Sequence, residues 1–167
     1  MSTKADGVTP NDPPSPEAYV RVEFRLEADE DGWPPYDAET CWARRTEDPE
    51  LVVIDNVLFF VREVSCGDVV RVGPADGTLR PFVEVVARGG HRTLRVIVHE
   101  ADATPHRDAV RALGCAVEGS SLAGLFAIDV PPQVELATVF ALLAGWEAEG
   151  VAEYEVGDAE EGREVER

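Results

Sequence analysis

The second half of the chain holds a succession of elements that few folds can accommodate. Thr104 is a helix N-cap candidate, Pro105 suits the first helical position, and Gly114 ends the predicted helix. Pro132 opens a longer predicted helix, which Gly150 ends. The predicted elements are, in order, a strand at 94–98, a helix at 104–113, strands at 115–119 and 125–130, a helix at 132–149 and a strand at 151–156. This β-α-β-β-α-β order predicts a ferredoxin-like unit, in which two helices cover one face of a four-stranded antiparallel sheet.

The first half carries strand patterns only. Residues 19–26 (YVRVEFRL) place four apolar side chains on one face of a strand and charged side chains on the other. The apolar run 57–61 (VLFFV) does not alternate and fits a buried strand. Further short strands are predicted at 41–45, 51–55, 69–72 and 78–87. Short strands separated by turns predict a small, strongly curved sheet or partial barrel.

These patterns divide the chain into four parts. We predict an α+β fold with a small β-rich (partial barrel) N-terminal lobe at 18–90, followed by a ferredoxin-like βαββαβ lobe at 91–157. Residues 1–17 are rich in Pro, Asp, Ser and Thr and predict a disordered tail. Residues 158–167 predict a second, acidic disordered tail.

The charge of the chain limits its partners. The formal net charge is −18, from 33 acidic and 15 basic residues. We expect no binding to nucleic acid, because that binding depends on neutralising phosphates with lysine and arginine. The acid excess favours a protein partner with a basic surface. Alternatively it reflects solubility and the composition of the source, since Lys4 is the only lysine.

Neither a membrane nor an oxidising compartment is indicated. No apolar run reaches the roughly 18 residues needed to cross a bilayer, and the N-terminus lacks the apolar stretch of a signal peptide. We therefore expect no membrane association and a cytoplasmic location. Cys41, Cys66 and Cys115 are far apart and odd in number, so we interpret them as small buried thiols rather than a disulfide framework.

The second predicted helix has an unusual apolar character. From Leu136 to Trp146 it has no charged side chain on any face, whereas a helix with one solvent-facing side would show polar residues there. Leu142 and Trp146 point away from the sheet-facing stripe, so a second surface should cover them. The first lobe is the expected cover, and a homodimer is the alternative, so the chain is a monomer or a homodimer.

No motif predicts a metal, a cofactor or a catalytic nucleophile. Residues 27–32 match the opening of a calcium loop, but Ala38 stands where a bidentate glutamate is needed. The histidines and cysteines lack zinc-ligand spacing. Cys66 has no base near it in the sequence. Gly89 and Gly90 precede a strand rather than the helix of a nucleotide-binding loop.

An aromatic loop is the first candidate binding element. Trp33 and Tyr36 flank two prolines in the turn-rich segment after the first strand. The structural interpretation is a rigid lid over the end of the barrel, because both side chains bury a large area and need only one polar partner. The functional interpretation is that Trp33 and Tyr36 line a pocket or dock a partner.

The second candidate lies in residues 85–99 (VVARGGHRTLRVIVH), the longest run without an acid. Strand alternation directs every second side chain from Leu94 to Val98 into the core. The candidate binding residues that remain are Arg88, His91, Arg92 and Arg95. They either pair with acids of the first lobe and pin the two lobes together, or form a pocket for an anion such as a carboxylate or phosphate.

Three segments, DEDGWPPYDAETCWARR, IDNVLFFVREVSCGDVVRV and GGHRTLRVIV, follow one another in the region of residues 20–98. With this order and spacing, the chain resembles a bacterial family known as domain of unknown function 4265. The resemblance implies a two-part cytoplasmic bacterial protein. It brings no established activity, so it assigns no functional residues.

Three classes of function follow from the sequence. The first is a non-enzymatic interaction protein that binds a basic protein partner, such as an antitoxin or immunity-type factor. The second is a small-molecule module that senses an anion at the lobe junction. The third is an enzyme that uses His91 with Asp68 or Glu84 as acid and base. We expect the first, because the sequence shows no catalytic constellation.

Overall fold

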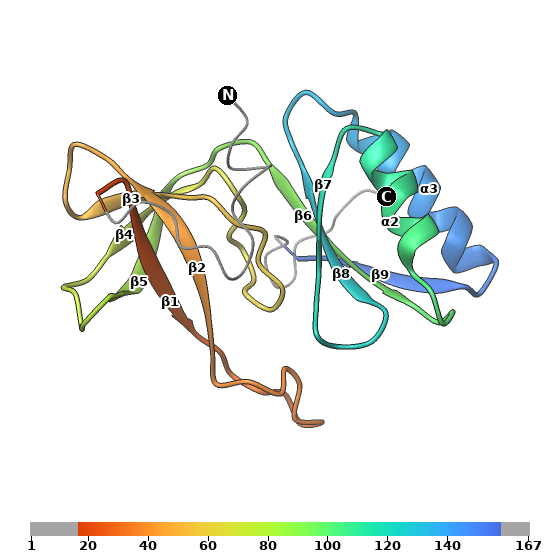
Figure 1. Ribbon diagram of the computed structural model, residues 1–167, viewed down its shortest axis with the longest axis horizontal. Coiled ribbons are helices and arrows are strands. Elements are labelled where there is room, and N and C mark those ends of the chain that lie inside the picture. Colours follow the sequence, from red (N-terminus) through yellow and green to blue (C-terminus); the bar gives the residue numbers. More distant parts are fainter. Residues whose placement is uncertain (1–16, 158–167) are drawn as a thin grey trace.

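Five strands of the first half close into a barrel, and four strands of the second half form an antiparallel sheet (Figure 1). The computed structural model describes residues 17–157, so the predicted tails lie outside the described residues except for Glu17. The elements are β1 (Tyr19–Arg25), β2 (Ala38–Arg45), β3 (Leu51–Ile54), β4 (Val69–Val72), β5 (Leu79–Ala87), β6 (Arg92–Val98), α2 (Thr104–Ala112), β7 (Ala116–Gly119), β8 (Leu125–Val130), α3 (Leu136–Ala148) and β9 (Ala152–Val156). The prediction of a mixed α+β fold is confirmed.

The barrel is closed by its first and last strands. β1 pairs antiparallel with β2 and parallel with β5, so no edge between β1 and β5 is left open. The alternation in β1 directs Val20, Val22 and Phe24 into the interior, where they are buried. They pack there with apolar side chains of the other strands, including Ile54 and Val70.

The sheet of the second half carries both helices on one face (Figure 1). Its strand order is β7-β8-β6-β9, and all three pairings are antiparallel. The helix-facing core contains alternate residues of β6, namely Leu94, Val96 and Val98, as the alternation predicts. Phe126 of β8 and Phe140 of α3 pack in the same core.

Helix α2 covers the apolar flank of α3. The Trp146 ring lies edge-on to the His106 ring of α2, with 4.8 Å between ring centroids. Leu142 packs against the same helix–sheet core. The prediction that the first lobe covers these two side chains is therefore wrong. The two helices lie side by side on the sheet, so the flank of one faces the other.

The apolar run 57–61 is a connection between β3 and β4, not a strand. Val57, Leu58 and Val61 are nevertheless buried. Three consecutive backbone N–H groups, those of Phe59, Phe60 and Val61, donate to the Glu39 carboxylate at 2.6, 2.8 and 3.2 Å. A side chain of β2 therefore satisfies the amides that a neighbouring strand would otherwise bind.

No helix formed by residues 17–157 combines the length and the apolar character needed to span a membrane.

Candidate functional site at the junction of barrel and sheet

The connection between β3 and β4 is held from both sides, and we call residues 58–61 the clamped segment. Glu39 of β2 binds its N–H groups. Arg95 of β6 binds its carbonyl oxygens: Nε donates to Leu58 at 3.4 Å, and Nη2 makes a short hydrogen bond to Val61. The clamped segment thus lies between the Glu39 carboxylate of the barrel and the Arg95 guanidinium of the sheet.

Arg95 is the buried arginine of this junction. Only 4% of the residue is exposed, and Nη1 donates to a carboxylate oxygen of Glu155 at 3.1 Å. Burial lowers the pKa of Arg95, while the Glu155 carboxylate opposes that shift. All three guanidinium nitrogens have partners within the chain. The prediction that this arginine helps to pin the two halves together is consistent with these contacts, although its carboxylate partner lies on β9 rather than in the first half.

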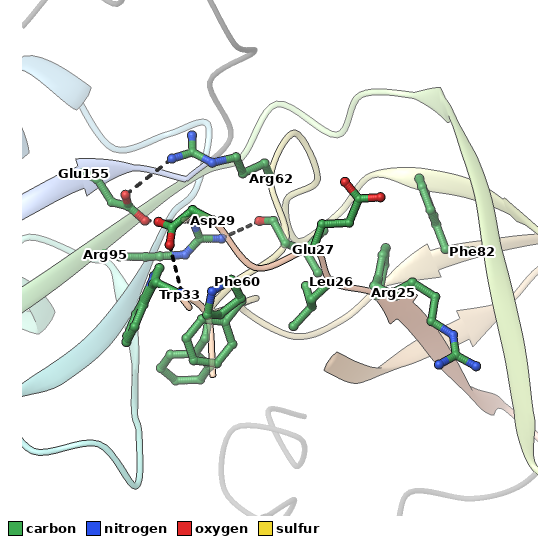
Figure 2. A pocket seen from close by; sticks show the side chains of 14 residues that line it. Arg25, Leu26, Glu27, Asp29, Trp33, Phe60, Arg62, Phe82, Arg95 and Glu155 are labelled. Carbon is green, nitrogen blue, oxygen red and sulfur yellow. Dashed lines mark hydrogen bonds and ion pairs between the residues drawn. The ribbon is translucent and has the colours of Figure 1, made fainter. Parts of the chain in front are cut away.

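A cavity of about 470 Å³ adjoins the clamped segment. Its apolar lining includes Trp33, Phe59 and Phe60, and Arg95 and Glu155 form part of its polar lining (Figure 2). A second hollow of about 230 Å³ shares four of these side chains and extends along the open face of the sheet past Ile97, Leu125 and Glu153. We call the two together the junction groove.

Exposed aromatic rings form one wall of the junction groove. The Trp33 and Tyr36 rings both contact the Phe60 ring, at centroid distances of 5.6 and 5.4 Å. Trp33 and Tyr36 are each 43% exposed, and Ile97 across the groove is 40% exposed. The loop that carries Trp33 is ordered by Asp29, whose Oδ1 accepts hydrogen bonds from the N–H groups of Asp31 and Trp33, both at 2.9 Å.

The arginines of the groove already have partners. Arg62 pairs with Glu155 at 3.6 Å, on the side of Arg95 opposite the aromatic rings (Figure 2). Arg25 lies 3.5 Å from Glu23. On the sheet side, Glu153 is largely exposed, and its carboxylate lies 3.4 Å from Nε2 of His99. The groove therefore presents aromatic faces and carboxylates, and its buried guanidinium group, that of Arg95, is bonded through all three nitrogens within the chain.

A second set of contacts ties the linker between β5 and β6 to the turn before β4. Asp68 is buried, and it accepts hydrogen bonds from the N–H groups of Ser65 and Gly89, both at 2.9 Å. Arg88 pairs with the same carboxylate at 3.2 Å and makes a short hydrogen bond to the Glu63 carbonyl. The expected pairing of Arg88 with an acid of the first half is present.

His91 contacts an acidic residue other than the two that were predicted. Its Nδ1 is 2.8 Å from Oδ1 of Asp129 on β8. Asp68 pairs with Arg88, and Glu84 pairs with Arg71. The predicted partnership of His91 with Asp68 or Glu84 is therefore wrong, because β8 lies beside β6 in the sheet and brings Asp129 to the histidine.

The structure divides the six candidate residues between two places. Trp33 and Arg95 line the junction groove, and Tyr36 lies beside it on Phe60. Arg88 and His91 lie in the linker between β5 and β6, and Arg92 is the first residue of β6. None of these three residues lines the groove. Sequence reasoning missed the contribution of Phe59, Phe60 and Glu155. For Phe59 and Phe60, the available signal in the sequence was the apolar run 57–61, which does not alternate.

Comparisons with known proteins identify a matching family and a solved structure of similar fold. One family model, described as "Domain of unknown function (DUF4265)", matches residues 39–154. The chain belongs to this family. The DUF4265 match begins in β2 and ends in β9, so it includes the clamped segment and the sheet side of the groove up to Tyr154. Trp33 and Tyr36 precede the match, and Glu155 follows it.

A solved structure of a hypothetical protein from Neisseria gonorrhoeae is similar in fold to this DUF4265 chain. The TM-score is 0.62 at 12% sequence identity, and the match covers 84% of this chain and 93% of the other. A search of curated proteins found no match.

Proposed function

We propose that this DUF4265 chain is a non-enzymatic interaction protein whose junction groove receives a positively charged segment of a partner protein. The observation that carries the proposal is the groove itself. Exposed aromatic and aliphatic side chains, Trp33 and Ile97 among them, lie beside carboxylates. This combination suits a lysine or arginine side chain, because its aliphatic stem packs on rings while its cationic end contacts both ring faces and carboxylates.

The overall charge supports a basic partner. A net charge of −18 steers a positively charged chain toward the protein and raises the rate of encounter. Glu153 lines the groove and is largely exposed, so it can exchange its contact with His99 for a partner cation. Trp33 supplies the type of side chain that most often dominates the binding energy of an interface.

The same contacts make an anion sensor the weaker proposal. At Arg95 an anion would have to compete with two carbonyl oxygens and with Glu155. Arg62 also contacts Glu155, so an anion there would compete with the same carboxylate.

The architecture proposed for this function consists of two lobes in the cytoplasm, at 18–90 and 91–157. The strand order β7-β8-β6-β9, with both helices on one face, supports a ferredoxin-like second lobe. The open face of its sheet meets the clamped segment and forms one side of the groove.

A peptide selection tests the proposal. Random peptides displayed on phage and selected on the purified full chain should become enriched in lysine or arginine beside an apolar residue. For the best peptide, Trp33→Ala should weaken binding about 30-fold, since removal of a central aromatic residue commonly costs about 2 kcal/mol. Binding by wild type should also weaken as salt is raised. Isothermal titration calorimetry gives these affinities.

Two variants serve as controls for that measurement. Val83→Ala removes another exposed apolar side chain, on β5 of the barrel, and Asp108→Asn removes an exposed acid on α2. Neither should change the affinity by more than about twofold, because neither residue lines the groove. Selected peptides without basic residues, or equal affinity for wild type and Trp33→Ala, would contradict the proposal.

A further inference from the structure

Cys66, His91 and Asp129 converge from three separate segments of the chain. Cys66 lies in the turn before β4, His91 in the linker before β6, and Asp129 in β8. One potential metal-ligating atom from each lies within 4.8 Å of the other two. Within residues 17–157, this is the one cluster of three such side chains.

The histidine of this cluster is held in place before any ion binds. Its Nδ1 contacts Asp129 at 2.8 Å, and its ring packs on the backbone of Gly67. A Cβ at Gly67 would lie 2.9 Å from Cδ2 of His91, so only glycine leaves room for the ring. Gly67 also has a φ of +85°, which favours glycine. The ring therefore has little freedom to turn away from the cluster.

The cluster is shielded and still reachable from solvent. The side chains of His91 and Asp129 are 24% and 10% exposed, and Cys66 is half-buried. Partly buried side chains lose less conformational entropy on binding an ion than fully exposed side chains do, and their remaining exposure lets an ion enter.

We propose that Cys66, His91 and Asp129 bind one Zn²⁺ ion, with water as the fourth ligand. Thiolate sulfur, imidazole nitrogen and carboxylate oxygen are the three donor types that zinc uses in proteins. Binding releases the proton of the Cys66 thiol to solvent, and the resulting thiolate and the Asp129 carboxylate neutralise the charge of the divalent ion. The sulfur and nitrogen donors argue against Mg²⁺ and Ca²⁺, which prefer oxygen.

Binding would join the two halves of the chain. Cys66 belongs to the connection that leads into the barrel strand β4, whereas Asp129 lies near the end of β8, one of the two inner strands of the sheet. Because the ion binds the folded arrangement and not the unfolded chain, it should raise the unfolding temperature. The proposal does not depend on the junction groove, since none of the three ligands lines it.

Metal binding to the full chain, purified without a histidine tag and stripped with a chelator under reducing conditions, tests this inference. Elemental analysis after addition of zinc sulfate and gel filtration should give one zinc per chain. The unfolding temperature should rise by several degrees. Co²⁺ in place of Zn²⁺ should give an intense near-ultraviolet absorption band from charge transfer between thiolate and cobalt, together with visible bands typical of tetrahedral cobalt.

Variants identify the ligands. Cys66→Ser should abolish the charge-transfer band and weaken zinc binding at least tenfold, and His91→Gln should weaken it similarly. His99→Gln and Cys115→Ala should bind as wild type does. Neither His99 nor Cys115 belongs to the cluster.

Circular dichroism of each variant shows whether it has folded, and His91→Gln provides a second test if Cys66→Ser does not fold. The proposal is overturned if the wild-type chain retains no zinc after gel filtration. It is equally overturned if the charge-transfer band persists in folded Cys66→Ser, or if zinc binding survives in folded His91→Gln with unchanged affinity.

Discussion

Replacement of Arg95 by methionine should lower the free energy of unfolding by about 2–5 kcal/mol, because each buried acceptor left without its donor costs about 1–3 kcal/mol. The variant leaves the carbonyl oxygens of Leu58 and Val61 without their donor. It also leaves the Glu155 carboxylate with one cation instead of two. Urea denaturation followed by fluorescence and by circular dichroism measures the loss.

Arg62→Met is the matched control. Arg62 shares Glu155 with Arg95, but its side chain is 58% exposed, so its ion pair is screened by water. We expect this variant to lose less than about 1 kcal/mol. Equal losses for the two variants would contradict the role given to the clamped segment, because they would mean that only the ion pair with Glu155 matters.

Replacement of Gly89 by alanine should lower the free energy of unfolding by about 2–3 kcal/mol, toward the upper end of the cost of overfilling a packed site. A Cβ there would overlap the carbonyl carbon and oxygen of Gly67 and lie 2.9 Å from its Cα. All three contacts are backbone atoms, so no side chain can rotate to relieve them. The shift would also disturb the hydrogen bond from the Gly89 N–H to Asp68.

Gly145→Ala tests the same substitution where there is space. Gly145 lies in α3, and a Cβ there meets nothing within 4 Å. Alanine should stabilise the protein by about 0.5–1 kcal/mol, because glycine loses more backbone entropy in a helix. Thermal unfolding of the two variants should thus shift in opposite directions. A neutral Gly89→Ala would show that the β5–β6 linker is not packed against the turn before β4.

Local patterns predicted the parts of the fold that depend on neighbours in the sequence. The alternation in residues 94–98 correctly placed Leu94 and Val96 in the core, because a strand with one face against helices buries every second side chain. Gly114 correctly marked the end of the first helix of the second half. Both features depend on residues that are only a few positions apart in the sequence.

The candidate site depends on partners far apart in the chain, which such patterns do not contain. The run around Leu58 is as apolar as a buried strand, but its amides bind Glu39, about 20 residues earlier. Arg95 meets carbonyl oxygens 34 and 37 positions before it. The approach of Cys66 to His91 and Asp129 likewise follows from tertiary packing, and the spacing of these residues in the sequence matches no metal-binding motif.

The three tryptophans offer the most direct measurement of the central claim, that the junction groove binds a basic segment. Trp33 lines the groove, Trp42 lies on β2 beside Arg21, and Trp146 lies on α3 beside His106. Their indole N–H groups give three resolved probes in a ¹⁵N–¹H correlation spectrum. Titration with the best basic peptide from the selection should shift the Trp33 indole signal and leave the Trp42 and Trp146 signals in place. A peptide that binds and shifts Trp42 or Trp146, but not Trp33, would contradict the claim.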